Sequence, residues 1–422
     1  MAAAHDQVDQ RPGMSGKRAL VVGLGRSGIA AASLLARQGA IVTVTDQKPE
    51  AALAEALRTL PVSIQRELGG HREDSFVGAD LIVLSPGVPP LPELAAARAA
   101  GVPVVGELEL GSRFVKAPLL AITGTNGKST TTTLAGAILA ATGRPTFVGG
   151  NLGIPLCEAA FSPALEAEGY AVVEVSSFQL EAIDSFRPSV GVLLNITPDH
   201  LDRYDGMDGY AAAKARLFEN QTAEDFAVLN LDDERVAALA PQLRAQVVPF
   251  SPTRPLRDGG WVEREALCVR LPGGAPERYP ADCPGLYGRH NQENALAAVL
   301  SARLLGASPE IVEAALRAFV PLPHRMTLVR THEGVLYFDD SKGTNVGAVV
   351  AALTGFPRPV VLIAGGRDKG GSYEPLAEAL RTSGRAAVVI GEAADRIAAA
   401  LANVVPVIRA ATMEEAVARA AE

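Results

Sequence analysis

A short apolar segment, a glycine-rich turn and a helical segment follow one another over residues 119–141. Leu119–Ile122 has the composition of a buried strand, and Ser129–Ala141 has that of a helix. The turn between them contains Thr-Gly-Thr-Asn-Gly-Lys. Such a turn directs backbone N–H groups and a helix N-terminus at one point. This strand–turn–helix unit predicts an α/β domain that binds a phosphate group.

The side chains of the turn are those that a nucleoside triphosphate requires. Lys128 supplies a mobile positive charge for the β- and γ-phosphates, and Ser129 or Thr130 supplies a hydroxyl for Mg²⁺. The common P-loop pattern has a glycine where this chain has Ile122, so the match to that pattern is imperfect. A turn that only caps a helix is the alternative. The lysine and the threonines around it favour binding of a nucleoside triphosphate.

Length, charge and cysteine content restrict the class of protein. The 422 residues suggest about three domains, and 48% hydrophobic residues suffice for ordinary globular cores. The net charge of −8 gives no electrostatic reason to expect nucleic acid or an anionic membrane as a partner. Cys157, Cys268 and Cys283 are widely spaced, which favours a reducing cytoplasm over a disulfide framework or a zinc site. No apolar run reaches membrane-spanning length, and we expect residues 1–16 to be a disordered lead without a signal peptide.

Apolar strands alternate with helices along most of the chain, which predicts parallel sheets with right-handed crossovers. The stretch 250–284, rich in Pro, Gly and Arg, is interpreted as a β-rich insertion or a sheet edge. A helix is expected at 295–305, and the Pro-rich link 321–323 marks a boundary. The predicted strands are 19–22, 41–45, 81–84, 102–105, 119–122, 171–175, 190–194, 227–230, 335–338, 360–364 and 387–390.

A second glycine-rich turn lies near the N-terminus. Gly23-Leu-Gly-Arg-Ser-Gly28 follows a predicted strand, and Asp46 closes the next strand about 20 residues later. This arrangement is typical of NAD binding. The same geometry also holds any pyrophosphate or ribose, and it occurs as a plain strand–helix turn. A further turn, Ser85-Pro-Gly87, ends another strand of the same unit, so a bound nucleotide is favoured.

Charged side chains gather where strands of the second unit end. Glu174 ends a strand and would face a ligand crevice, either to coordinate Mg²⁺ or as an ordinary surface acid. The loop Thr197–Tyr204 holds two aspartates, His200 and Arg203, a density that favours a function over local ion pairs. Lys214 lies in an amphipathic helical pattern, which by itself predicts a solvated surface lysine.

Later polar segments each leave two interpretations. Asn291 and Asn294 begin a helix and would either read a base edge or cap the helix. Arg325 would either clamp a γ-phosphate or lie exposed in a linker. The segments 339–345 and 365–371 each follow a strand and are either plain polar turns or parts of one crevice.

Together these motifs resemble the Mur ligase and folylpolyglutamate synthetase superfamily. The turn at 123–130 has the short glycine spacing of that superfamily, which explains why the common P-loop pattern fits poorly. Between residues 17 and 371 the motifs follow the order of the members that add D-glutamate. They are Gly23–Gly28, Val44–Asp46, Ser85–Gly87, Gly106–Glu109, Gly149–Asn151, Glu174–Gln179, Asp199–Arg203, Leu322–Arg325 and Asp340–Asn345.

The resemblance implies an α/β protein of three domains. These are a Rossmann-like domain for a UDP-sugar at 17–110, a central P-loop ATPase domain with a parallel sheet at 111–320, and a C-terminal dinucleotide-fold domain at 321–422 that closes on the site. It implies an ATP- and Mg²⁺-dependent ligase that joins D-glutamate to UDP-N-acetylmuramoyl-L-alanine in the cytoplasm. That step belongs to peptidoglycan precursor synthesis, which serves cell shape and division. We expect a monomer whose partners are these small substrates.

The resemblance also implies roles for individual residues. Implied ATP contacts are Gly124, Thr125, Asn126, Gly127, Lys128, Ser129, Thr130, Asn291, Asn294, Arg325, Asp340 and Lys342. Implied UDP-sugar contacts are Arg26, Ser27, Asp46, Gln47, Gly87, Asn151 and His200. Implied D-glutamate contacts are Thr344 and Lys369. Implied metal ligands are Ser129, Glu174, His200 and a carbamylated Lys214, and implied catalytic residues are Lys128, Asn151, His200 and Lys214.

Alternatives to this ligase stay open. A folylpolyglutamate synthetase-like enzyme leaves the N-terminal nucleotide motif without a role, and an NAD-dependent dehydrogenase leaves the P-loop unexplained. Family members usually continue past the last helix into another strand and a Ser-Pro-Ala-Cys-Ala-Ser-like loop. We therefore expect a truncated C-terminal domain with a weakened hold on D-glutamate. A non-catalytic nucleotide-binding relative is the third alternative.

Overall fold

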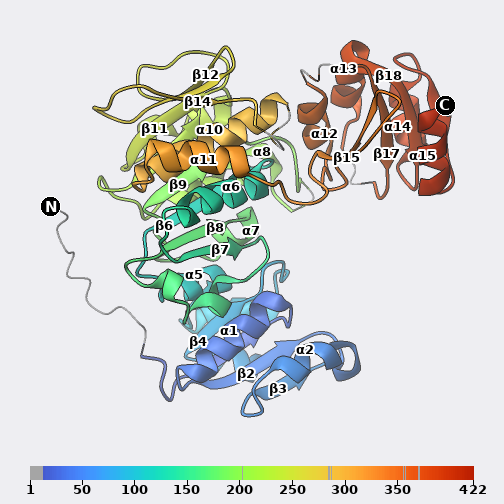
Figure 1. Ribbon diagram of the computed structural model, residues 1–422. Coiled ribbons are helices and arrows are strands. Elements are labelled where there is room, and N and C mark those ends of the chain that lie inside the picture. Colours follow the sequence, from blue (N-terminus) through green and yellow to red (C-terminus); the bar gives the residue numbers. More distant parts are fainter. Residues whose placement is uncertain are drawn as a thin grey trace.

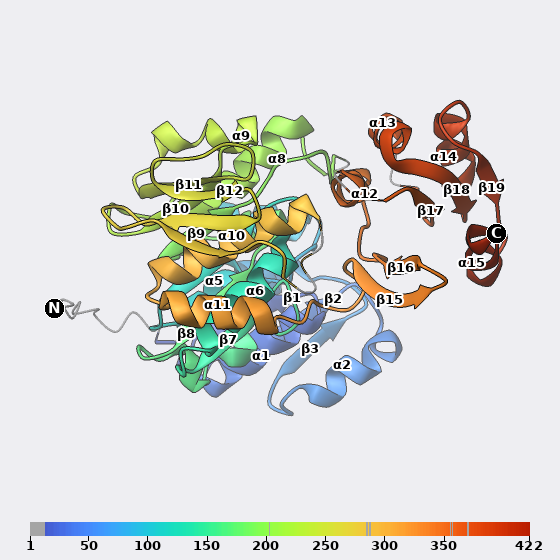
Figure 2. The same ribbon diagram turned by 45° about the horizontal axis from the view of Figure 1, so that its top comes forward.

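The computed structural model describes residues 13–422 except 202, 284–285, 287, 355, 357 and 369–370. Of the predicted disordered lead at 1–16, residues 1–12 lie outside the described residues. Three α/β units follow one another along the chain (Figure 1). The second view shows the C-terminal unit again set to one side of the central unit (Figure 2). No helix of the described residues has both the length and the apolar character to cross a membrane.

The N-terminal unit is a parallel five-stranded sheet of order β3-β2-β1-β4-β5. Its central strands are continuous apolar runs, as expected of strands covered on both faces. A Cβ atom on Gly28 would lie 1.9 Å from the Gly23 carbonyl oxygen, so glycine there lets the first helix approach the first strand. The elements are β1 (Arg18–Val22), α1 (Arg26–Arg37), β2 (Ile41–Asp46), α2 (Ala54–Thr59), β3 (Gln65–Leu68), α3 (Glu73–Val77), β4 (Leu81–Leu84), α4 (Pro92–Ala99) and β5 (Val104–Gly106).

The central unit is a nine-stranded sheet of order β14-β13-β12-β11-β10-β9-β6-β8-β7. The strands from β7 to β12 are parallel, and β12, β13 and β14 form an antiparallel end. The expected β-rich edge at 250–284 is therefore confirmed. The strands are β6 (Leu119–Thr123), β7 (Thr146–Gly150), β8 (Tyr170–Glu174), β9 (Val190–Leu193), β10 (Phe226–Asn230), β11 (Gln246–Ser251), β12 (Gly259–Glu263), β13 (Ala266–Arg270) and β14 (Glu277–Pro280).

Two apolar cores lie against this sheet, and α6 packs on α10 in one of them. The second half of α10, Ala295–Ala302, is completely or almost completely buried, which explains its run of Ala, Leu and Val. The helices are α5 (Glu107–Ser112), α6 (Lys128–Ala140), α7 (Ser177–Leu180), α8 (Gly206–Ala215), α9 (Glu234–Ala237), α10 (Arg289–Leu304) and α11 (Pro309–Ala318).

The C-terminal unit has its own core around a parallel sheet of order β17-β18-β19, preceded by the antiparallel hairpin β15–β16. Each unit thus buries a separate set of apolar side chains. The elements are β15 (Thr327–His332), β16 (Val335–Asp339), α12 (Val346–Leu353), β17 (Val360–Gly365), α13 (Glu374–Ser383), β18 (Gly384–Ile390), α14 (Ala394–Leu401), β19 (Val407–Arg409) and α15 (Met413–Ala421).

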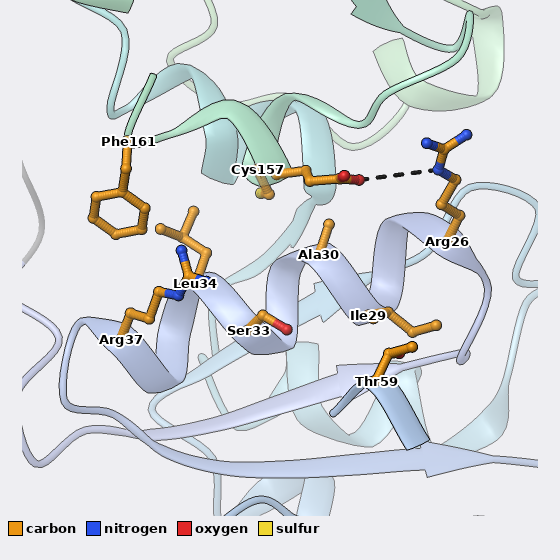
Figure 3. A pocket seen from close by; sticks show the side chains of 10 residues that line it. Arg26, Ile29, Ala30, Ser33, Leu34, Arg37, Thr59, Cys157 and Phe161 are labelled. Atoms are coloured by element: carbon orange, nitrogen blue, oxygen red, sulfur yellow. Dashed lines mark ion pairs between the residues drawn. The ribbon is translucent and has the colours of Figure 1, made fainter. Parts of the chain in front are cut away.

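A cavity of about 370 Å³ lies between α1 and the short 3₁₀ helix Leu156–Ala159, where the N-terminal and central units meet (Figure 3). At one end Arg26 lies 3.9 Å from the Glu158 carboxylate. At the other, the Arg37 guanidinium lies 5.4 Å from the centre of the Phe161 ring. Contacts at both ends of the cavity therefore join the two units.

Two buried glutamates of α5 lie at the same junction. Glu109 accepts hydrogen bonds from three consecutive backbone N–H groups, those of residues 184–186, and from Arg113. Glu107 is less well satisfied: one oxygen accepts from the Cys157 N–H at 2.7 Å, and the other has no partner among the described residues. Burial raises the pKa of Glu107 from 4.5 to about 7.

Replacing Glu107 by glutamine is expected to flatten the pH dependence of stability. The folded protein holds the proton of this carboxyl more tightly than the unfolded chain does. The free energy of unfolding therefore falls, by about 3 kcal/mol, as pH rises from 4.5 through about 7. Urea unfolding at pH 5 and pH 8 should show the two proteins alike at pH 5 and Glu107→Gln the more stable at pH 8. An equal stability difference at both pH values would contradict the assignment, and the exposed Glu219→Gln serves as control.

Candidate active site

The glycine-rich turn between β6 and α6 needs its glycine at 127. Gly127 has φ +85°, and a Cβ atom there would lie 2.1 Å from the Asn294 amide oxygen. Thr131 donates to that same amide oxygen at 3.4 Å, and Asn294 donates to Asn291 at 3.1 Å. The structure thus brings the predicted residues of α10 against the turn, and their side chains are not merely caps of their own helix.

The loop after β9 fixes the turn from the other side. The Asn195 side-chain oxygen accepts from the backbone N–H of Thr125 at 3.1 Å and of Asn126 at 2.8 Å. Thr125 in turn donates its hydroxyl to the Thr197 carbonyl at 3.2 Å. Sequence reasoning did not find Asn195, because a lone asparagine at a strand end carries no motif.

A buried carboxylate closes one end of the site. Glu174 ends β8, and its two oxygens accept from the Ser129 hydroxyl at 2.6 Å and from the Asn151 amide at 2.7 Å. Arg325 donates to the same Ser129 hydroxyl at 2.7 Å. Glu174 of the central unit and Arg325 of the C-terminal unit therefore meet at the Ser129 hydroxyl, and Asn151 holds the other oxygen of Glu174. The interpretations of Glu174 as a surface acid and of Arg325 as an exposed linker residue are both wrong.

Two lysines point at one carbonyl of the turn. Lys128 donates to the carbonyl oxygens of Gly124 at 2.9 Å and Thr125 at 2.7 Å, and Lys214 donates to the Gly124 oxygen at 2.7 Å. Burial lowers the pKa of Lys128 and, together with the charge of Lys128, lowers that of Lys214 well below its usual value.

The prediction that Lys214 is a solvated surface lysine is wrong. Only 1% of this residue is exposed, and its ammonium lies 4.6 Å from the centre of the Tyr210 ring. The helical pattern of α8 does show which face is buried. It could not show that the P-loop, rather than apolar core, covers the lysine.

His200 lies on the loop after β9 in a strained conformation. Its φ is +54°, its backbone N–H donates to Asp199 at 3.1 Å, and its side chain is 42% exposed. Strain of this kind in a non-glycine residue gathers at functional sites. The predicted loop therefore places a histidine within reach of solvent.

The C-terminal unit touches the P-loop through the loop before α12. Asn345 donates to the side chains of Asn126 at 3.1 Å and Asp199 at 3.3 Å. Asp340 accepts from the Met326 N–H at 3.1 Å, and burial raises its pKa. The predicted contacts Lys342 and Thr344 lie exposed in this loop. The predicted contact Lys369 lies outside the described residues.

The second glycine-rich turn lies at the carboxyl ends of β1, β2 and β4. Asp46 accepts from the N–H groups of Leu24 at 2.8 Å and Lys48 at 2.9 Å, so it shapes the turn. Ser85 donates to the Gly23 carbonyl at 2.7 Å. The predicted Gly87 has φ +85° and open space at its Cβ position. Arg26 and Gln47 are exposed and Ser27 is partly exposed at the same edge.

A cleft of about 280 Å³ continues from this edge toward the central unit. It is lined by the loop 84–91 on one side and by Phe178, Gln179, Glu181 and Arg203 on the other. Nucleotides bind outside the carboxyl ends of strands in open α/β sheets. The position of the cleft therefore suits a molecule that reaches from the N-terminal turn to the loop of His200.

Comparison with known proteins identifies the family. The model described as "Mur ligase MurD-like, N-terminal domain" matches residues 17–106, "Mur ligase middle domain" matches 122–302, and "Mur ligase, glutamate ligase domain" matches 324–422. The chain belongs to the Mur ligase family.

Curated Mur ligases resemble the chain over nearly its whole length. A UDP-N-acetylmuramoylalanine–D-glutamate ligase of Geotalea daltonii is 50% identical over 407 residues, which are 96% of this chain and 89% of that protein. The ligase of the same name from Geobacter metallireducens is 51% identical over 410 residues, 97% of this chain and 90% of that protein.

Solved Mur ligase structures share the fold at lower identity. A pseudomurein peptide ligase type C from Methanothermus fervidus aligns with a TM-score of 0.60 at 21% identity, covering 96% of this chain and 94% of that one. A UDP-N-acetylmuramate–alanine ligase from Thermotoga maritima aligns with a TM-score of 0.57 at 21% identity, covering 94% and 91%. These likenesses support the three-unit α/β architecture.

Mur ligases use ATP and Mg²⁺, and the donor set beside the P-loop of this one suits that ion. The oxygens of Ser129 and Glu174 are hard donors, the kind that Mg²⁺ prefers. Among the described residues, no three His, Cys, Asp or Glu side chains are close enough to hold a metal. Mg²⁺ usually keeps several waters and binds one or two carboxylates together with substrate phosphates, so this sparse set fits it.

Proposed function

We propose that this Mur ligase joins D-glutamate to UDP-N-acetylmuramoyl-L-alanine with hydrolysis of ATP, a step of peptidoglycan precursor synthesis. The convergence of Glu174 and Arg325 on the Ser129 hydroxyl, with the Lys128 ammonium close enough to interact with both charges, supports phosphoryl transfer from ATP. The choice of D-glutamate is supported by relatives of that name, about half identical over 96% of the chain. We propose a monomeric enzyme of the cytoplasm, where ATP is supplied.

In the proposed reaction the alanyl carboxylate attacks the γ-phosphorus of ATP, so an acyl phosphate forms and ADP leaves. Lys128 and Arg325 neutralise the charge on the transferred group. The amine of D-glutamate then attacks the acyl carbon, the amine loses a proton, and phosphate leaves from a tetrahedral intermediate. The chain contributes mainly position and charge, because both steps involve reactants already activated.

The proposed ligand contacts follow the geometry of the three units. Asp46 would hold the UDP part, together with Arg26, Ser27, Gln47 and Gly87 at the same edge. Asn151 and His200 would touch the muramoyl-alanine part. Asn291 and Asn294 would contact the base of ATP. Proposed contacts from the C-terminal unit are Arg325, Asp340 and Lys342 for ATP, and Thr344 and Lys369 for D-glutamate.

Mg²⁺ and a carbamylated lysine complete the proposal. When bound, the ion neutralises phosphate charge and orients the transferred group. Ser129, Glu174 and His200 are the side chains proposed to hold it, with a carbamate on Lys214 as an anionic partner. The lowered pKa of Lys214 supports that modification, because only the neutral amine reacts with CO₂.

The release of ADP with Mg-ATP and UDP-N-acetylmuramoyl-L-alanine tests the proposal. We expect turnover with D-glutamate and none with L-glutamate or without an amino acid. Turnover with L-glutamate on a folate substrate would instead support the folylpolyglutamate synthetase-like alternative. Tight ATP binding without turnover under any condition would support a non-catalytic relative.

A further inference from the structure

Two aromatic side chains contact the imidazole of His200, and a third packs against both of them. The Phe178 ring lies 4.9 Å from it in an edge-on arrangement, and the Tyr210 ring lies 6.4 Å away. Tyr204 completes the group: its ring is stacked 6.1 Å from Phe178 and tilted against Tyr210 at 5.3 Å. We call Phe178, Tyr204 and Tyr210 the aromatic bracket. Contacts at these distances hold a ring by packing and by the electrostatics of aromatic edges and faces.

Glu181 ties the bracket together from one side. Its carboxylate accepts two hydrogen bonds from Arg203, at 2.6 and 3.3 Å, and one from the Tyr204 hydroxyl at 2.5 Å. The Arg203 guanidinium in turn lies 4.6 Å from the centre of the Phe178 ring. A bidentate arginine–carboxylate pair fixes orientation as well as distance. Glu181, which directly follows α7, therefore orients Tyr204 directly and Phe178 through Arg203.

The other side of the bracket reaches the P-loop. The hydroxyl oxygens of Thr125 and Tyr210 lie 3.3 Å apart, within hydrogen-bond distance, and Lys214 lies over the Tyr210 ring. Burial raises the pKa of Tyr210 to about 12, and the Thr125 hydroxyl offsets only part of this rise. The Tyr210 hydroxyl therefore stays protonated at neutral pH. The bracket thus joins the His200 loop to the turn that would hold the phosphates.

We propose that Glu181 is a positioning residue, which acts through Arg203, Tyr204 and the aromatic bracket to hold His200 against the reacting groups. The backbone of His200 needs such support, because its φ of +54° is disfavoured for a residue with a side chain. His200 is also 42% exposed at its side chain, so the local backbone alone does not fix the ring. Arg203 and Tyr204 each donate a backbone N–H to the His200 carbonyl, at 3.0 and 3.3 Å, so the residues that Glu181 holds are joined directly to the His200 backbone.

The chain offers a matched control for Glu181. Glu219 forms a similar bidentate pair with Arg216, with both hydrogen bonds at 2.9 Å. The exposed fractions of the two pairs are also close, 33% and 34% for Arg216 and Glu219 against 30% and 32% for Arg203 and Glu181. Arg216 also donates to the backbone carbonyl of Glu181 at 2.7 Å, so this pair lies beside Glu181 without bonding to its carboxylate. Glu181→Gln and Glu219→Gln therefore remove the same kind of interaction in different places.

The experiment compares these two variants by turnover and by histidine NMR. Because the role of His200 rests on the proposed function, the NMR measurement is chosen to be independent of turnover. The ring protons of His200, assigned with His200→Asn, are shifted by the neighbouring aromatic rings. We expect them to move toward their unfolded-chain positions in Glu181→Gln and to stay in place in Glu219→Gln. We also expect kcat to fall by roughly 10- to 100-fold in Glu181→Gln with an unchanged KM for ATP.

Each outcome decides the inference. Unmoved His200 resonances in a folded Glu181→Gln would overturn it, whatever happens to kcat. Moved resonances with kcat equal to that of the wild type would overturn it as well. If Glu181→Gln does not fold, Tyr204→Phe removes one of the three hydrogen bonds at little structural cost, and it should shift the same resonances by a smaller amount. An inactive wild type with moved resonances in the variant would contradict the proposed function and leave the positioning intact.

Discussion

Replacing Lys214 by methionine is expected to reduce turnover by two to three orders of magnitude, on the order of what removal of a preorganised charged group costs. Methionine has nearly the same length and removes the cost of a buried, desolvated ammonium, so the protein should remain folded. It has no nitrogen that could take up CO₂. The proposed anionic partner of the metal would therefore be lost, while the P-loop lysine stays in place.

A measurement of CO₂ dependence separates this effect from simple damage. Wild-type turnover should fall in CO₂-depleted buffer and recover with bicarbonate, and ¹³CO₂ should give a carbamate signal in ¹³C NMR. Lys214→Met should show neither response. A wild type without a carbamate signal, or a variant with wild-type turnover, would contradict the modification of Lys214.

Replacing Lys128 by methionine is expected to lower kcat by about three orders of magnitude. In the structure this lysine is held by the carbonyl oxygens of Gly124 and Thr125, so its charge already lies within the turn before a nucleotide arrives. Its loss would leave the phosphates without the cation that neutralises them during transfer. ADP release measures the effect, and bicarbonate should make no difference to this variant.

Lys116→Met is the matched control for that experiment. Its ammonium pairs with Glu166 at 3.1 Å and its side chain is 46% exposed, whereas Lys128 is held within the turn. Exposed pairs of this kind contribute about 0–1 kcal/mol, so stability and turnover should change little. Equal losses in the two lysine variants would show that charge in general, rather than Lys128, supports turnover.

The parts of the fold that could be predicted are those whose signal is local. β1, β4 and β6 are short apolar runs that end at glycine-rich turns, and they lie within a residue of their predicted bounds. β3, with the sequence Gln-Arg-Glu-Leu, and the edge strand β19 were missed. Both are short or polar, and they become strands only because a neighbouring strand offers hydrogen bonds.

The residues of the site also fall into those that could be predicted from local sequence and those that could not. Lys128 and Ser129 could be predicted, because a phosphate-binding turn requires residue types at fixed spacing. Asn195, Tyr210 and Glu181 could not, because each acts through contacts with segments far away in the sequence. Roles that depend on which groups meet in space, rather than on which neighbours follow in the chain, leave no pattern to read.

The contact made by Asn345 has a consequence for exchanging parts between relatives. This residue caps α12 by accepting from the Ala348 N–H, and its amide also donates to Asn126 and Asp199 of another unit. The units have separate cores, so each is a plausible module for a chimaera. The reactive centre, however, belongs to none of them. A grafted C-terminal unit would have to bring an asparagine that serves its own helix and its new host at once, so modules that are each stable do not by themselves make a working chimaera.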